Sequence, residues 1–193
     1  MEILLTILLV LLVIIVLAAL WGIKVYNKFI KLKTLMEEAW SVIDVFLKKR
    51  YDLIPNLVES VKGYATHEKE TLEAVILARS NAMGAKDVTS KAASEGELGS
   101  VLGRLMAITE KYPELRANEN FMYLQNELSG LEKEIERARR YYNGTVRENN
   151  IAIKVFPASI IAGMFKFVAG VFFEIVNKNE REAPTVSFAK KPE

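Results

Sequence analysis

Few residues in this sequence have the types and spacing that chemistry requires. The single histidine, His67, stands beside Glu68 and Glu70, and these three side chains are the group that most resembles a metal site. A metal would need further ligands and a second shell of hydrogen bonds, and the sequence offers none at a recognised spacing. The two acids suit the positive end of a helix dipole, so we interpret the group as a helix start without a metal or cofactor.

Other catalytic and binding classes lack their signatures. The 193 residues include no cysteine, which excludes disulfides and thiolate chemistry, and no glycine-rich phosphate loop is found. Residues 137–142, RARRYY, mix cations and aromatic rings as nucleic-acid binders do, but a net charge of +2 is too small for that role. We expect these arginines to form surface salt bridges. The chain is therefore predicted to be non-enzymatic, with no catalytic residue, no cofactor and no nucleic-acid partner.

The elements that would position these residues begin with an apolar stretch. Residues 3–21, ILLTILLVLLVIIVLAALW, carry no charge and one polar side chain, Thr6. At about 1.5 Å per residue they span close to 30 Å, the thickness of a bilayer's hydrocarbon core. We predict a transmembrane anchor over residues 1–23. A secretory signal peptide is the alternative, but only Glu2 precedes the apolar run where a signal peptide has basic residues.

Aromatic and basic residues flank the predicted anchor on one side. Trp21 is followed by lysines and a tyrosine with no acid before Glu37. Because cations concentrate on the cytoplasmic side, we predict a single-pass protein of the bacterial inner membrane with its N-terminus outside. The alternative is that the lysines are only the solvated face of the next helix. The predicted membrane-interface residues are Trp21, Lys24, Tyr26 and Lys28.

Apolar periodicity predicts long helices after the anchor. Residues 24–62 continue the anchor without a break, although Pro55 lies within the apolar stripe and should cost about 3 kcal/mol as a helix kink. A short helix is expected over residues 67–83, with Thr66 as its N-cap. Residues 84–100, GAKDVTSKAASEGELGS, are rich in small and polar residues and are predicted to form a loop. A third helix is expected to end before Pro113.

The clearest periodicity lies between residues 121 and 156. Apolar residues recur there in steps of three and four, which predicts a helix with coiled-coil-like packing that ends before Pro157. Together these helices predict an all-α protein, in which the transmembrane helix continues into an elongated antiparallel four-helix bundle over residues 24–155. The repeated positions are Phe121, Leu124, Leu128, Leu131, Ile135, Ala138, Tyr142, Val146, Asn149, Ile153 and Phe156.

An apolar segment follows the last long helix. Residues 156–176, FPASIIAGMFKFVAGVFFEIV, contain only two charged side chains, and such runs on soluble surfaces usually mark contacts. The segment could lie in the membrane interface, pack on its own bundle or on neighbouring subunits, or span the bilayer a second time. Residues 177–193 are expected to be a polar tail. The predicted membrane or oligomer contacts are Ile160, Ile161, Met164, Phe165, Phe167, Phe172 and Phe173.

Four stretches carry a resemblance to a known family. They are YDLIPNLVESVKGYATHEKETLEAV, KYPELRANENFMYLQNELSGLEKEIERARRYYN, FPASIIAGMFKF and REAPTVSF. In this order they resemble the LemA family of bacterial membrane proteins. The resemblance implies one N-terminal membrane helix and a mainly cytoplasmic bundle, without agreed catalytic residues. One member is associated with magnetosome membrane formation, which favours membrane organisation. The apolar VAGVFFEIV departs from the polar, proline-containing sequence common in the family.

Two functions fit these observations. The first is a membrane-anchored scaffold that self-associates at the inner membrane, with the lipid bilayer and further copies of itself as partners. The second is an adaptor or receptor that docks another membrane protein or a cytoplasmic partner through the region of Pro55 to Gly63.

Overall fold

The computed structural model describes residues 1–65 and 67–174, and the regular secondary structure within those ranges is helical. The all-α prediction is confirmed. Thr66, the last two residues of the apolar segment and the predicted tail at 177–193 lie outside the described residues. The helices are α1 (Glu2–Lys62), α2 (Lys69–Gly84), α3 (Val88–Thr109), α4 (Pro113–Arg116), α5 (Glu119–Ala152) and α6 (Ala158–Met164).

The described chain divides into two compact units. Residues 1–56 and 122–173 form the first, and residues 57–121 form the second. Helix α1 leaves the first unit one residue after Pro55, an exposed proline that lies within the continuous helix. The kink at Pro55, the single four-helix bundle and the domain limits at 23, 155 and 176 stay predictions.

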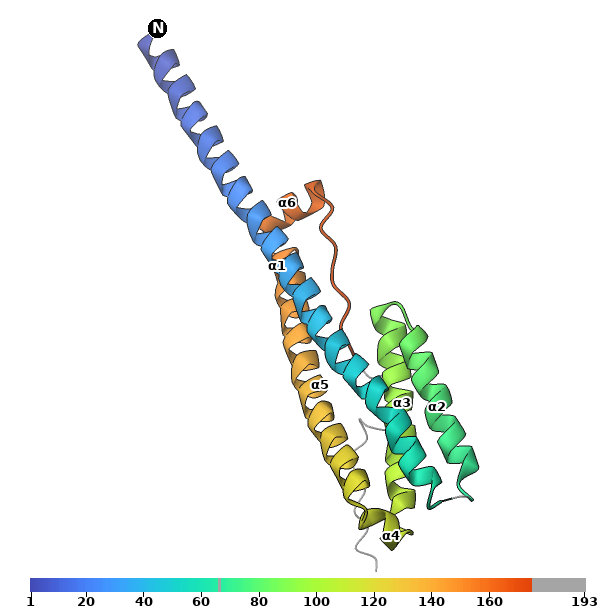
Figure 1. Ribbon diagram of the computed structural model, residues 1–193. Helices are drawn as coiled ribbons and strands as arrows, with labels where there is room; N and C mark the ends of the chain where they lie inside the picture. The colour runs from blue at the N-terminus through green and yellow to red at the C-terminus, as the bar shows by residue number, and fades with distance from the viewer. Residues whose placement is uncertain (66, 175–193) are drawn as a thin grey trace, which may run out of the picture. The chain divides into compact units, whose positions relative to one another are not determined.

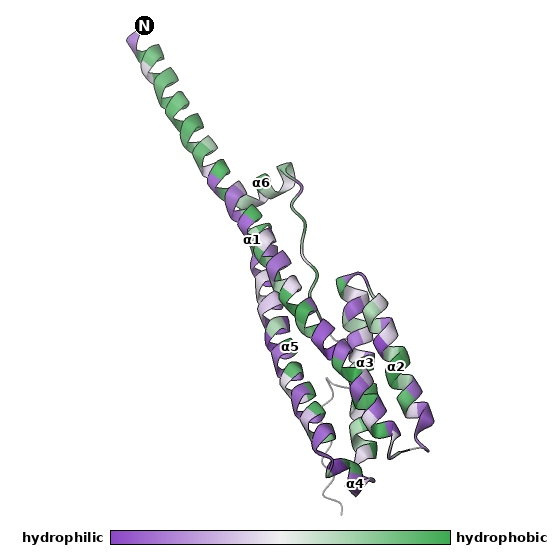
Figure 2. Cartoon of the chain, viewed as in Figure 1, coloured by the Kyte–Doolittle hydropathy of each residue, from purple (hydrophilic) through white to green (hydrophobic). Residues whose placement is uncertain are grey.

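Helix α1 begins as an apolar rod. Side chains from Ile3 to Leu20 are exposed, and hydrophobic residues surround the helix on every side (Figure 2). Thr6, the polar exception, donates its hydroxyl hydrogen to the carbonyl oxygen of Glu2 at 2.9 Å. Within the described residues, α1 is the one helix long and apolar enough to cross a membrane.

In the first unit, α1 and α5 lie side by side (Figure 1). The repeat predicted along α5 is buried or half-buried from Phe121 to Ile153, whereas Phe156 lies beyond the helix end and is exposed. Burying each large apolar side chain contributes about 1.5–3 kcal/mol, so this face holds the helix in place. The buried residues from α1 include Phe29, Ala39, Ile43 and Leu47, and those from α5 include Leu128, Ile135, Tyr142 and Val146.

In the second unit, α2 and α3 form a hairpin joined by residues 85–87 (Figure 1). The prediction of a loop over residues 84–100 is therefore wrong. Asp87 caps α3 by accepting a hydrogen bond from the Ser90 amide at 2.9 Å, and Lys91 donates from Nζ to the Ala82 carbonyl at 2.8 Å. Small and polar residues are compatible with a helix once a cap and a partner helix are supplied. The third helix does end before Pro113, which begins α4.

Candidate functional site

The candidate site is formed by α1, α5 and the residues that follow α6, all within the first unit. The helix α6 ends in a Schellman motif, in which the Phe167 amide donates to the Ala162 carbonyl at 2.9 Å and Lys166 adopts a φ of 56°. Glycine is usual at this left-handed position, so Lys166 is unusual there. Beyond it, residues 167–173, here called the strap, run in a non-helical conformation beside α1 and α5 (Figure 1).

Two asparagines of α5 pair with the strap backbone as another strand would. Asn150 donates to the Gly170 carbonyl at 2.9 Å and accepts from its amide at 2.7 Å. Asn143 makes the same pair of bonds with Phe173, at 3.1 and 2.8 Å. The seven-residue step from Asn143 to Asn150 rises about 10.5 Å along the helix, and the three-residue step from Gly170 to Phe173 spans about 10 Å when extended. The two asparagines are therefore spaced to reach these two strap residues. The strap therefore runs antiparallel to α5.

Two further side chains of α5 complete the polar contacts. Tyr142 donates its hydroxyl hydrogen to the Val171 carbonyl at 2.9 Å, and Asn149 donates to the Val168 carbonyl at 3.3 Å. Burial raises the pKa of Tyr142, which keeps the phenol protonated as a donor. Asn149, the polar residue among the predicted repeat positions, thus has a hydrogen-bond partner in the strap.

The strap also lies close to α1. A Cβ atom added at Gly170 would lie 2.9 Å from the Met36 sulfur and 3.4 Å from a Val146 methyl carbon, so a larger residue would displace the strap or the Met36 side chain. Phe173 is 1% exposed, and its ring centroid lies 5.8 Å from that of Trp40. The Arg139 guanidinium lies 5.1 Å from the same ring, within cation–π range.

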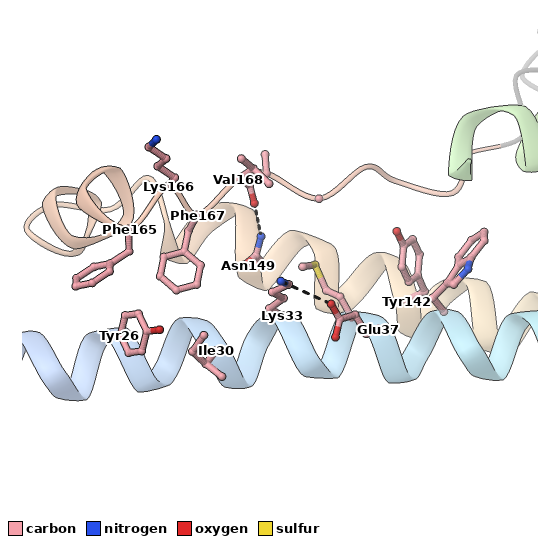
Figure 3. Close-up of a pocket in the computed structure, with 14 residues that line it drawn as sticks. Tyr26, Ile30, Lys33, Glu37, Tyr142, Asn149, Phe165, Lys166, Phe167 and Val168 are labelled. Carbon is pink, nitrogen blue, oxygen red and sulfur yellow. Dashed lines mark hydrogen bonds and ion pairs between the residues drawn. The ribbon is translucent and has the colours of Figure 1, made fainter. Parts of the chain in front are cut away.

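Aromatic rings join α1 to the start of the strap. The Tyr26 ring centroid lies 4.7 Å from that of Phe165 and 5.7 Å from that of Phe167 (Figure 3). Phe29, which is fully buried, lies 5.0 Å from Phe167 between centroids. Aromatic pairs at such distances add about 0.5–1.5 kcal/mol each beyond area burial.

A pocket of about 550 Å³ lies between α1 and the strap (Figure 3). Tyr26, Ile30 and Phe165 line one end and Tyr142 lines the other (Figure 3). The Trp40 ring, which also lines the pocket, lies 5.5 Å from that of Tyr142 between centroids. A Lys33–Glu37 ion pair at 3.9 Å lies on its α1 side. The lining residues combine apolar and aromatic side chains with the charged groups of Lys33, Glu37 and Lys166, so the pocket offers apolar and hydrogen-bonding surface.

The helix α6 contacts α1 where the apolar rod ends. A Cβ atom added at Gly22 would lie 3.6 Å from Cδ1 of Ile161, which places α6 in van der Waals contact with this turn. An apolar cleft of about 300 Å³ lies between them, lined by Ala19, Gly22, Ile23, Tyr26, Ile161 and Phe165.

The structure brings several predicted contact residues together. Tyr26 shares the pocket with Phe165 and Phe167, and Ile161 lies beside Gly22. Phe173 is buried within the chain, whereas Trp21, Lys24, Lys28, Ile160, Met164 and Phe172 are exposed. The assignment of these residues to membrane or oligomer contacts stays a prediction. In the described parts of the chain, residues 156–174 contain a seven-residue helix and no second spanning helix.

Sequence reasoning missed Asn143 and Asn150. The available signal is the pair YN at 142–143 and NN at 149–150, seven residues apart on one helix. The prediction that the arginines of RARRYY form surface salt bridges is confirmed for two of them. Arg137 pairs with Glu134 and Arg140 with Glu136, each at 2.6 Å. Over residues 1–65 and 67–174, no three His, Asp or Glu side chains converge in a way that could hold a metal ion.

Residues 39–188 match the sequence profile of the LemA family, which is more than half of the chain. The chain belongs to the LemA family. The match includes α5, α6 and the strap, and the earlier resemblance is thereby confirmed.

Several known proteins are similar to this chain at low identity. Protein LemA of Metamycoplasma hominis is 28% identical, in an alignment that covers 70% of this chain and 63% of the relative. Magnetosome protein MamQ 2 of Paramagnetospirillum magneticum and magnetosome protein MamQ of Magnetospirillum gryphiswaldense are each 25% identical, with 77% of this chain and 64% of each relative covered. The chain thus spans less than two thirds of the length of these relatives.

Proposed function

We propose that this LemA-family chain is a membrane-anchored, non-enzymatic scaffold that self-associates at the bacterial inner membrane. The observation that carries the proposal is the excess of exposed apolar surface in the first unit. The whole first part of α1 is exposed from Ile3 to Leu20, and lipid is the environment that such a rod requires.

Self-association is supported by apolar side chains that lie beyond the rod. On the strap, Val168 is 77% exposed and Val171 is 53% exposed, although the strap backbone is held firmly by α5. On α1, Val42 and Val45 are about half exposed. A firmly held surface with unpartnered apolar side chains suits contact with another copy of the chain. The MamQ relatives are named magnetosome proteins, and this favours a role in membrane organisation.

The test is the mass of the full-length protein in detergent or nanodiscs, measured by light scattering over a range of concentrations. We expect a defined oligomer. The double variant Val168→Ser/Val171→Ser should shift the protein towards monomer. Ser129→Ala, at an exposed position of α5, is the control and should leave the mass unchanged. A monomer at every concentration would end the self-association proposal.

The second candidate function is an adaptor for another membrane or cytoplasmic protein. It is favoured by Ile76 and Leu77 of α2, adjacent side chains that are 51% and 62% exposed in the second unit. A photo-crosslinker at position 77 should then capture a different protein in cells, and one at the exposed Ser100 of α3 should capture less of it. Recovery of self-contacts alone would count against the adaptor.

A further inference from the structure

We infer that α6 and the turn before it form a second lipid contact, which lies in the interface of the same membrane that α1 crosses. This inference rests on the proposed insertion of α1. Within the predicted contact segment, it assigns α6 and the turn before it to lipid, and it leaves the exposed side of the strap for contact with other copies of the chain.

The first argument is position along α1. Ile161 meets α1 at Gly22, and the Phe165 ring lies 4.7 Å from Tyr26 between centroids. Trp21, of the residue type enriched at membrane interfaces, immediately precedes Gly22. Residues 22–26 lie within about 8 Å of Trp21 along the helix axis. The helix α6 is therefore held at the depth at which α1 leaves the lipid.

The second argument is the division of α6 into two faces. Ala162 is 4% exposed and Ile161 half-buried, and these side chains face the chain itself. Ile160 and Met164, four residues apart and so on one face, are 53% and 69% exposed. In the turn before α6, Phe156 is 76% exposed. This second face has no partner in the described chain.

The third argument is charge, which favours lipid over a second copy of the chain. The sequence from 152 to 173 contains two cations and no acid, and α1 contains four lysines before its first acid after the rod, Glu37. Two copies meeting here would bring like charges together, whereas anionic headgroups neutralise them. The apolar cleft between α6 and α1 lies at the same level and suits an acyl chain. The cations are Lys24, Lys28, Lys31, Lys33, Lys154 and Lys166.

The test uses tryptophan as a depth probe in the full-length protein. Trp21→Phe and Trp40→Phe remove the native indoles. Met164→Trp then reports on α6, Tyr141→Trp reports on an exposed position of α5, and Val13→Trp reports on the rod. Each variant is reconstituted in vesicles of phosphatidylcholine and phosphatidylglycerol that contain lipids brominated at a shallow or a deep acyl position. Helix content is checked by circular dichroism.

We expect the probe at 164 to be quenched about threefold more by shallow bromines than the probe at 141, and to be shielded from aqueous iodide. If the probe at 13 is quenched by bromines while 164 responds only to iodide, the inference is wrong and the anchor stands. If the probe at 13 also escapes bromine quenching, the membrane-anchored function itself is wrong.

Discussion

At the residue scale, the main finding is that two asparagine side chains of α5 hydrogen-bond the strap backbone in the way that a neighbouring strand would. Asn143 and Asn150 each satisfy both the amide and the carbonyl of one strap residue. An extended segment without such partners would leave its backbone groups to water or unpaired. These side chains explain how a non-helical segment is held in an all-helical unit.

Asn150→Ala should release the centre of the strap. The variant loses two hydrogen bonds to Gly170, worth about 1 kcal/mol each, so the strap amides should exchange with solvent about 30-fold faster. Hydrogen exchange of residues 167–173, measured by mass spectrometry in nanodiscs, checks this. Glu148→Ala, at an exposed position of the same helix, should leave the exchange rate unchanged. Unaltered exchange in Asn150→Ala would contradict the assigned role.

The raised pKa of Tyr51 leads us to expect that the free energy of unfolding falls in alkali. The pKa of Tyr51 is raised from 10.0 to about 12, mainly by burial, with an opposing effect from Arg50 and a smaller rise from Asp44. The unfolded chain would ionise near pH 10 while the folded chain retains the proton. Stability is therefore complete below pH 10 and is lost between about pH 10 and 12, by about 2 kcal/mol.

An absorbance titration of phenolate in the intact protein measures this ionisation. The wild-type protein should show late-titrating tyrosines, with Tyr142 among them. Tyr51→Phe should remove one of them, whereas Tyr141→Phe, a change at an exposed position, should leave the late step unchanged. If Tyr51→Phe keeps the whole late step, the assignment to Tyr51 is wrong.

At the element scale, α1 and α5 are joined by a charged pair as well as by apolar contacts. Arg50 of α1 is 3% exposed, and its Nη1 lies 2.6 Å from Oε1 of Glu132 on α5. Both residues belong to the first unit. The buried guanidinium requires a negative partner, so this pair fixes how the two helices align.

Glu132→Gln should destabilise the protein more than the matched change at an exposed pair. We expect a loss of about 1–2 kcal/mol, because the buried cation of Arg50 loses charge compensation. Glu134→Gln, which breaks the exposed pair with Arg137, should cost less than about 0.5 kcal/mol. Thermal unfolding in detergent, followed by circular dichroism, compares them, and equal costs would contradict the role of Arg50–Glu132.

At the scale of the whole molecule, the proposed function depends on which parts of the chain meet lipid. The flank that follows the rod is basic, with four lysines between residues 24 and 33 and no acid before Glu37. This basic flank supports the proposed orientation, with the N-terminus outside and the remaining helices in the cytoplasm.

The natural absence of cysteine allows a direct test of orientation. Ser129→Cys, at an exposed position of α5, should be blocked by a membrane-impermeant maleimide only after the cells are permeabilised. Glu2→Cys, at the exposed start of α1, should be blocked in intact cells. The reverse pattern would overturn the orientation while leaving the anchor itself intact.

Much of the fold follows from local physics. The apolar length of the rod, the continuity of α1 to Lys62, the end of α2 at Gly84 and the repeat along α5 all follow from the 3.6-residue period and from helix-ending residues. The first part of α3, from Val88 to Glu97, was missed because composition outweighed a readable cap, Asp87 with Ser90 three residues later.

The helical class, the membrane-length apolar rod and membership of the LemA family can all be predicted from the residues alone. The course of the apolar segment after α5, a short helix against Gly22 followed by the strap, becomes visible only in the folded chain. Its hydrogen bonds join residues 19 to 30 positions apart, between side chains of a helix and the backbone of an extended segment. No periodicity encodes such pairs, because each depends on where two distant segments meet in space.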